Sequence, residues 1–296
     1  MRILPLLFLC FPLTAQQNIA EQLGHPADAR MLIIHADDLG VAHSVDTASI
    51  AAFEARGITS ASIMVPCPWF PEIAAYAANH PEMDWGIHLT FTAEWKYYKW
   101  DGVLPSSEIS SLLDTTGYFY ASVGEFIAHA DPLEVEAEMR AQIDRAQAFG
   151  IKLTHLDSHM GSLYAKPEFT EIFQRVGREY GLAVFQPSAL PIALDSTNII
   201  IDDVYMMDET IPAHQWPSFY NDLLAQMKPG LHELIVHLAF DGAEMRAVTI
   251  DHPAFGSAWR QNDYDYVTSD ALKAFLAAQQ IILVDWGDLQ KTLNFD

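Results

Sequence analysis

Met31-Leu32-Ile33-Ile34 is an apolar run that leads directly into His35-Ala36-Asp37-Asp38-Leu39-Gly40. Four apolar residues in a row predict a strand that is buried on both faces, as in parallel sheets. Adjacent carboxylates at the end of such a strand must be solvated, paired, protonated or bound to a metal. Ligands and catalytic residues of α/β folds collect at the carboxyl ends of the strands. The junction therefore predicts a functional site, or else an Asp38 that caps a helix and a solvated Asp37.

Strand-like runs recur along the chain between segments with helical spacing. Such alternation predicts a mainly parallel sheet, and about eight strands in one domain favour a barrel. We expect an α/β fold, a single-domain distorted (β/α) TIM-like barrel of about 7–8 strands, with a doubly wound open sheet as the alternative. The expected strands are Met31–Ala36, Ser60–Pro66, Trp85–Phe91, Leu153–Asp157, Ala183–Gln186, Ile199–Val204, Glu233–Leu238 and Ile281–Asp285. The expected helices are Val45–Arg56, Pro132–Phe149, Pro167–Tyr180 and Ser269–Gln280.

The composition restricts the partners of the protein. The chain has 296 residues and is 50% hydrophobic, with 16 Lys plus Arg against 39 Asp plus Glu, so its formal net charge is −23. This charge argues against binding to nucleic acid or to an anionic membrane. It leaves neutral or cationic substrates, such as amino sugars, unopposed.

The first residues have the pattern of an export signal. Met1-Arg2 is a short positive start, Ile3 to Leu13 is apolar, and Thr14-Ala15 supplies small residues. This stretch is too short for a membrane span, and its prolines argue against the alternative of a buried helix. We expect residues 1–15 to be a cleaved signal peptide, the protein to be periplasmic or secreted, and residues 27–296 to form the domain.

Residues able to bind a metal recur at the ends of the expected strands. They are Asp37, Asp38, His88, His155, Asp157, His159, His237 and Asp285. A single buried histidine is usually a satisfied core residue, but several at one end of a sheet indicate a site. One carboxylate and two imidazoles would leave open positions for water and substrate. The spacing favours a metal site over a structural polar network.

The stretch His155-Leu156-Asp157-Ser158-His159 places alternating residues on one strand face, so all three polar side chains can point into the barrel. Not all of them need be ligands, because Asp157 could instead orient a ligating imidazole. The chain has no Gly-x-Gly-x-x-Gly, no phosphate-binding Gly-rich loop, no His-Glu-x-x-His and no Gly-x-Ser-x-Gly. These absences argue against a dinucleotide enzyme and a serine hydrolase.

Two long connections interrupt the alternation. Thr92 to Ala128 contains the aromatic residues Trp95, Tyr97, Tyr98 and Trp100, and Ser188 to Asn221 is rich in proline and acidic residues. Long connections often form the walls or lids of active sites. The aromatic residues would stack on sugar rings or, as the alternative, form a small core beneath the loop.

The ordered motifs resemble those of the YdjC-like (ChbG/HpnK) carbohydrate deacetylases. The resemblance rests on Ala36-Asp37-Asp38-Leu39-Gly40, Gly86-Ile87-His88-Leu89-Thr90, Thr154-His155-Leu156-Asp157-Ser158-His159, Thr59 to Pro66 and Leu234-Ile235-Val236-His237. Each motif is short, but the ordered set covers nearly the whole chain. The chain departs from many relatives at Gly161, where they carry a histidine, and at Asp46, where they often carry asparagine.

The resemblance implies a distorted barrel that removes acetyl groups from N-acetylated sugars with a divalent metal ion. By this analogy Asp38, His88 and His159 are the metal ligands, Asp37 is the general base and His237 is the candidate general acid. Both Mg²⁺ and Zn²⁺ suit such a ligand set, as does Mn²⁺.

Further residues have supporting roles to fill. Thr90 or a backbone N–H could assist the oxyanion, and His155 and Asp157 could support the ligands. Arg260 and Asp263 could brace the site or meet substrate, but we interpret them as an exposed salt bridge.

The substrate class leaves alternatives open. The expected substrate is a small sugar or oligosaccharide with an N-acetyl group, although the bond could be an ester. A metal-dependent hydrolase of another bond, such as a phosphoester, could use the same residues. A non-catalytic periplasmic sugar-binding protein is the other alternative. The oligomeric state is a separate question, for which a homodimer is left open.

Overall fold

Strand β1 (Arg30–Leu39) passes through the centre of the fold in the computed structural model, which describes residues 18–190 and 199–293. Leu32 and Ile34 point into the large apolar cluster beneath the surrounding helices. Met31 and Ile33 point the other way, into a second cluster at the base of the barrel. The strand is therefore buried on both faces, which is what its continuous apolar run predicts.

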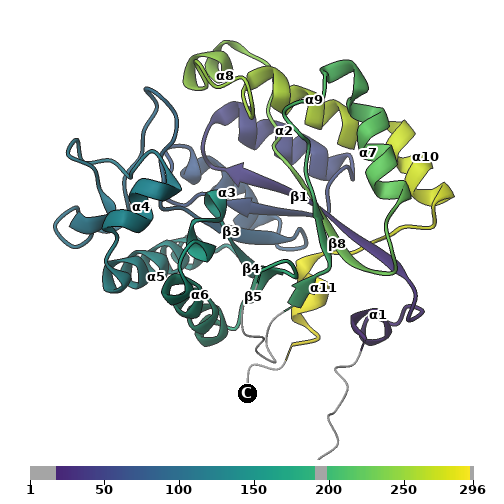
Figure 1. The fold of residues 1–296 in the computed structure, drawn as a ribbon, viewed down its shortest axis with the longest axis horizontal. Coiled ribbons are helices and arrows are strands. Elements are labelled where there is room, and N and C mark those ends of the chain that lie inside the picture. The colour runs from purple at the N-terminus through teal and green to yellow at the C-terminus, as the bar shows by residue number, and fades with distance from the viewer. Residues whose placement is uncertain (1–17, 191–198, 294–296) are drawn as a thin grey trace, which may run out of the picture.

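Strand β1 is part of one parallel sheet that curves into a barrel (Figure 1). Its order is β6-β5-β4-β3-β2-β1-β8-β7, and β9 pairs with the start of β1. The other strands are β2 (Ser60–Ile63), β3 (Trp85–Leu89), β4 (Leu153–Ser158), β5 (Ala183–Pro187), β6 (Ile199–Ile201), β7 (Asp203–Tyr205), β8 (Gly230–Val236) and β9 (Ile282–Leu283).

Strands β6 and β7 join the two ends of this sheet. Only Asp202 separates them in the chain, yet β6 pairs with β5 and β7 pairs with β8. The extended segment 199–205 therefore bridges the edges of the sheet and makes a nearly closed barrel. This closure confirms the predicted TIM-like barrel. The alternative prediction, a doubly wound open sheet, is wrong. The barrel is distorted because the last strand is short and lies beside the base of β1.

Helices cover the outside of the barrel (Figure 1). Those predicted are α2 (His43–Glu54), α5 (Pro132–Ala148), α6 (Pro167–Tyr180) and α10 (Asp270–Ala278). Helix α5 begins at a proline behind the cap Asp131, and α6 ends at Gly181, whose φ is +66°. The others are α1 (Ile19–Gln22), α3 (Phe70–Asn79), α4 (Val123–His129), α7 (Trp216–Ala225), α8 (Ala243–Val248), α9 (Ser257–Val267) and α11 (Trp286–Gln290), with short 3₁₀ turns at Ser110–Leu112, His159–Tyr164 and Ala213–Gln215.

The interior of the barrel is layered from base to mouth. The base is apolar and includes Met31, Ile33 and Trp286. Above it lies a layer of buried polar side chains that includes His35 and His155, each at most 1% exposed. The carboxyl ends of the strands lie above that layer. Since the apolar base closes one end, ligands reach the barrel from the other.

The aromatic residues of the long connection after β3 pack mainly into the large apolar cluster. Trp95 and Trp100 are each 2% exposed, and their rings meet edge to face with centroids 5.8 Å apart. Tyr98 packs against the same core, whereas Tyr97 points outward. Most of these aromatic residues therefore have a packing role, as in the second interpretation, but within the main core, and Trp95 also lines the cavity at the mouth of the barrel.

The N-terminal part of the folded chain extends further than expected. Helix α1 lies before residue 27 and buries Ala20 against the base of the barrel. The expected signal peptide, residues 1–15, lies outside the described residues. Along residues 18–190 and 199–293, no helix combines the length and apolarity needed to cross a membrane.

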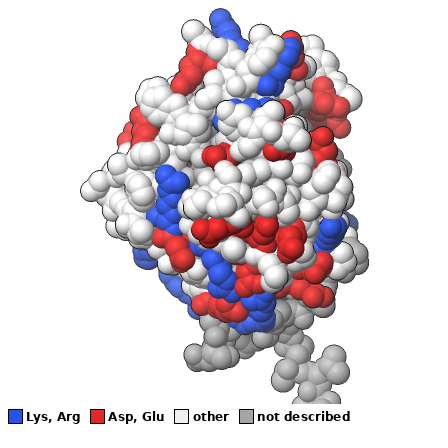
Figure 2. All heavy atoms as spheres, turned by 90° about the vertical axis from the view of Figure 1, so that its left-hand side faces the viewer, with Lys and Arg blue, Asp and Glu red and all other residues white. Residues whose placement is uncertain are grey.

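Charged side chains of both signs are mixed on the surface. On the face shown in Figure 2, basic groups lie beside acidic ones rather than gathering into one area. One network of ion pairs links α5 to α6, where Arg140 and Arg175 each contact Glu136 and Glu179. Pairs of this exposed kind contribute about 0–1 kcal/mol each.

Asp46 carries a prediction about stability. Its Oδ1 accepts the backbone N–H of Gly40 at 2.5 Å, while its side chain is fully buried. Burial raises the pKa of this carboxyl well above its usual value. The protonated carboxyl of Asp46 therefore stabilises the folded state at low pH. This stabilisation is lost as the pH rises from the unfolded-state pKa toward the higher folded-state pKa.

Asp46→Asn keeps the acceptor oxygen and does not titrate. We expect it to be more stable than wild type at pH 9 by at least about 1 kcal/mol, with a smaller difference at pH 5. Urea unfolding at both pH values measures this. Asp46→Ala, which lacks the acceptor, should be destabilised at both. An Asp46→Asn protein with the pH dependence of wild type would contradict the account.

Candidate active site

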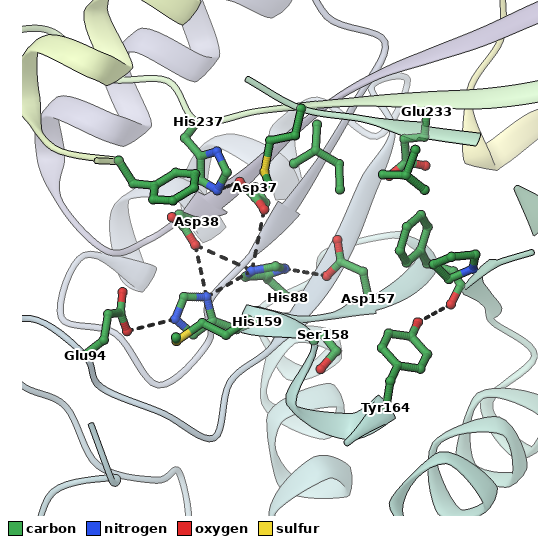
Figure 3. A pocket seen from close by; sticks show the side chains of 18 of the residues that line it. Asp37, Asp38, His88, Glu94, Asp157, Ser158, His159, Tyr164, Glu233 and His237 are labelled. Carbon is green, nitrogen blue, oxygen red and sulfur yellow. Dashed lines mark hydrogen bonds and ion pairs between the residues drawn. The ribbon is translucent and has the colours of Figure 1, made fainter. Parts of the chain in front are cut away.

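Asp37 and Asp38 face the same cavity because β1 is irregular at its end. Between Ala36 and Leu39 the pairing with β2 shifts by one residue, which is a β-bulge, and Asp38 has φ +65°. Adjacent side chains of a regular strand point to opposite faces. The extra residue and the left-handed backbone turn the second carboxylate inward (Figure 3). Left-handed non-glycine residues are uncommon and cluster at functional sites.

Two histidines converge on Asp38. His88 is the penultimate residue of β3, and its Nε2 lies 3.5 Å from Asp38 Oδ1. His159 follows β4, and its Nδ1 lies 3.3 Å from the same oxygen and 3.2 Å from His88 Nε2. The ligand atoms of these three buried residues all lie within 4.8 Å of one another, so they could hold a metal ion.

Each of these imidazoles has a carboxylate on its other nitrogen. His88 Nδ1 lies 2.6 Å from Asp157 Oδ1, and His159 Nε2 lies 3.0 Å from Glu94 Oε2 (Figure 3). Carboxylates in this position fix the ring orientation and the tautomer of a metal-ligating histidine. The geometry matches the orienting role considered for Asp157. Glu94 was not expected, because it lies in the long connection after β3.

Arg260 holds the other oxygen of Asp38. Its Nη2 lies 2.6 Å from Asp38 Oδ2, and the arginine is only 1% exposed. The guanidinium also donates to the Phe255 carbonyl. The interpretation of Arg260 and Asp263 as an exposed salt bridge is therefore wrong, because α9 directs both side chains into the protein.

Asp37 pairs with His237. His237 Nε2 lies 3.3 Å from Asp37 Oδ1, while Asp37 Oδ2 lies 3.8 Å from His88 Nε2. Asp263 supports this arrangement from behind. Its two oxygens accept the backbone N–H of His237 at 3.1 Å and the hydroxyl of Tyr220 at 2.5 Å. The two adjacent carboxylates thus have different surroundings, one beside a guanidinium and the other beside an imidazole.

We call the place where the ligand atoms of Asp38, His88 and His159 meet the convergence point. Other expected residues lie away from it. His155 is deeper in the barrel, where its ring stacks on Trp286. Thr90 does not line the cavity. Its hydroxyl donates to the backbone carbonyl of His88 at 2.6 Å. Asp285 caps α11 by accepting the N–H of Asp288. Asp38 caps no helix, since Ala42 occupies that position before α2.

The electrostatics of the site reflect competition between burial and neighbouring charges. Burial raises the pKa of Asp38, but Arg260, His159 and His237 together outweigh burial and hold that pKa well below the usual range. Burial lowers the pKa of His159, but Glu94 and Asp38 raise it to about 10. Asp157 likewise raises the pKa of His88 against the effect of burial. The pKa of His237 is lowered, chiefly by burial, so this imidazole is neutral at pH 7.

These residues line a cavity of about 580 Å³ at the mouth of the barrel. Arg260 is the only lysine or arginine among its lining residues in the described part of the chain. Glu233, on β8, also faces this cavity, and sequence reasoning missed it. The alternation Glu233-Leu234-Ile235-Val236-His237 could have revealed it, since the glutamate and the histidine share a strand face.

Residues 31–278 match the sequence model of a family described as YdjC-like protein. The chain belongs to this family. A carbohydrate deacetylase of Thermus thermophilus is 31% identical over 272 residues, covering 88% of this chain and 94% of that protein. A carbohydrate deacetylase of Brevibacillus brevis is 30% identical over 269 residues, covering 87% and 99%. A crystal structure of an Enterococcus faecalis protein, provisionally described as a cellobiose-phosphate cleavage protein, has a TM-score of 0.75 at 23% identity, covering 88% and 99%.

The metal-ligand candidate His159 of this YdjC-like chain should be unusually basic. After chelation of divalent metals, we expect His159 to titrate near pH 10, because Glu94 and Asp38 stabilise its charged form. His155 should stay neutral over the same range, since burial lowers its pKa. Ring ¹⁵N chemical shifts measure both. Glu94→Gln should lower the pKa of His159 and leave His155 unchanged. Titration of His159 near 6.5 in wild type would show the site electrostatics to be wrong.

Proposed function

We propose that this chain is a metal-dependent carbohydrate deacetylase that hydrolyses the N-acetyl amide of an amino sugar or oligosaccharide. The observation that carries the proposal is the convergence of Asp38, His88 and His159 beside the Asp37–His237 pair. The two relatives named carbohydrate deacetylase, each at least 30% identical over most of the chain, support it. The cavity at the mouth of the barrel is large enough for a small-molecule substrate.

The donor set fits a divalent cation. Asp38 Oδ1 is buried and has no hydrogen-bond partner among the described residues, although its pKa is lowered and it is ionised. A buried anionic oxygen of this kind, facing two imidazole nitrogens, is what a cation would satisfy. Asp38, His88 and His159 would hold the ion, and Zn²⁺ or Mg²⁺ would suit them. When bound, the cation would act as a Lewis acid on the acyl carbonyl and acidify the attacking water.

Asp37 is the proposed general base. It is adjacent to Asp38 but is not paired with Arg260, so its carboxylate is available to take a proton from the attacking water. His237 Nε2 lies 3.3 Å from Asp37 Oδ1. The neutral imidazole can accept that proton and then deliver it to the departing amine. Amide hydrolysis needs this second transfer, because an unprotonated amine is a poor leaving group.

Three further residues are proposed to position these groups. Asp157 holds His88, Glu94 holds His159, and Arg260 holds Asp38, each through an atom that points away from the convergence point. None of the three needs to touch the reacting atoms. Their loss should weaken metal binding by about 10–100-fold, as for other partners of metal ligands.

The alternatives receive less support from the geometry. A phosphoester substrate would call for cationic side chains, but the one arginine of the described lining is already paired with Asp38. A purely sugar-binding role would leave the Asp37–His237 pair and the three convergent ligand atoms without a use. The expected export of the protein remains part of the proposal, resting on residues 1–15.

The proposed roles make a sharp distinction between two substitutions. Asp37→Asn should bind metal like wild type but lose about 10²–10⁴-fold in turnover, because the base is gone. His159→Ala should lose the metal itself. Metal content by elemental analysis and acetate release from N-acetylglucosamine oligomers measure both effects. Thr47→Ala, at a partly exposed position on α2 outside the cavity, is the control.

Three experimental outcomes would contradict the proposed roles or the proposed reaction. Full turnover by Asp37→Asn would eliminate Asp37 as the base. Unchanged metal content in His159→Ala would eliminate that histidine as a ligand. Phosphate release from sugar phosphates without acetate release from any acetylated sugar would replace the proposed reaction with the phosphoester alternative.

A further inference from the structure

The cavity extends beyond the convergence point into a region with different chemistry. In Figure 3, Tyr164 and Glu233 lie on the far side of Asp157 from Glu94. The walls there come from the end of the 3₁₀ turn after β4, from β5 and from the β7–β8 pair. We call this region the apolar lobe, and it is lined by Tyr164, Phe185, Pro187, Val204, Met206 and Ile235.

The apolar lobe offers few partners to a polar ligand. The Tyr164 hydroxyl is already used, because it donates to the backbone carbonyl of Phe185. Glu233 lies at the floor, where its Oε2 accepts the indole N–H of Trp286 at 3.1 Å. Burial raises the pKa of Glu233 to about 8, so this carboxyl is neutral at pH 7. The lobe is therefore apolar and almost uncharged.

We propose that the apolar lobe receives the acyl chain of the substrate, so that the enzyme removes acyl groups longer than acetyl from amino sugars. This inference rests on the proposed function. The reaction is unchanged in kind: the water oxygen bonds to the acyl carbon, the C–N bond breaks, and the amine leaves with a proton. The products are a short-chain carboxylate and the free amino sugar.

The two ends of the substrate have opposite requirements. An amide carbonyl at the convergence point carries the sugar on its nitrogen side and the alkyl chain on its carbon side. A sugar ring brings several hydroxyls, each of which must find a partner when it leaves water. The side of the cavity with Glu94 and His237 carries such groups (Figure 3), and the apolar lobe does not. The alkyl chain is therefore the part that fits the lobe.

The exposure of the lobe supports an apolar occupant. Val204 and Met206 are 37% and 43% exposed although they border a cavity rather than the outer surface alone. A methyl group is too small to cover a recess with six lining side chains. A longer chain would remove this apolar surface from water, and each added methylene would tighten binding by about fourfold.

The test is an acyl-length series. We expect kcat/KM of the metal-loaded enzyme on N-acetyl-, N-propionyl-, N-butyryl- and N-hexanoyl-chitobiose to stay level or rise up to butyryl. Val204→Phe, which narrows the lobe, should reduce butyryl and hexanoyl hydrolysis at least tenfold relative to its own acetyl hydrolysis. Leu283→Phe on β9, outside the cavity, is the matched control and should leave this ratio unchanged.

Calorimetric binding of N-acetyl- and N-hexanoyl-glucosamine keeps the test independent of turnover. Wild type should bind the hexanoyl compound at least tenfold more tightly, and Val204→Phe should abolish that difference. Acetate release combined with rejection of longer acyl groups, or equal affinity for the two sugars, would overturn the lobe assignment. No acid release from any substrate, with the binding difference intact, would instead overturn the deacetylase function.

Discussion

The ion pair between Arg260 and Asp38 is the interaction on which the site depends. Asp38 sits at a β-bulge with a left-handed backbone, almost completely buried. A carboxylate there would be strongly unfavourable without a cation beside it. Arg260 engages Oδ2 and thereby leaves Oδ1 facing His88 and His159. Removing one partner of a buried pair typically costs about 3–5 kcal/mol, so the constraint is structural as well as chemical.

The layer beneath the site keeps its other ligands in place. Asp157 accepts from the Ser62 hydroxyl at 2.8 Å, lies 3.0 Å from His35 Nε2, and contacts His88 with its second oxygen. Burial lowers the pKa of His35, but Asp157, together with Glu233 and Asp37, raises it to about 9, so this imidazole is a buried cation. A charged group from β1 therefore helps to hold a carboxylate on β4, which orients a histidine on β3. Such a network is stable only because its members satisfy one another.

Sequence reasoning succeeded where the signal was local. The apolar run Met31 to Ile34, the polar residues at the strand ends and their order along the chain predict the barrel and bring Asp38, His88 and His159 to one end of it. It failed where the partner is distant or the backbone irregular. Arg260 lies 222 residues from Asp38, and nothing in its local pattern distinguishes it from a surface arginine. Glu94 lies in a connection without periodicity, and no local pattern predicts the bulge that turns Asp38 inward.

A crystal structure of the protein soaked with Zn²⁺, with the ion located by anomalous scattering, would decide whether Asp38, His88 and His159 form a metal site. We expect one ion bound by Asp38 Oδ1, His88 Nε2 and His159 Nδ1. We also expect Arg260 to stay on Asp38 Oδ2 and Asp37 to stay unbound beside His237. An ion held by His35, His155 and Asp157 instead, or an Asp38 that leaves Arg260 when the ion binds, would contradict this expectation.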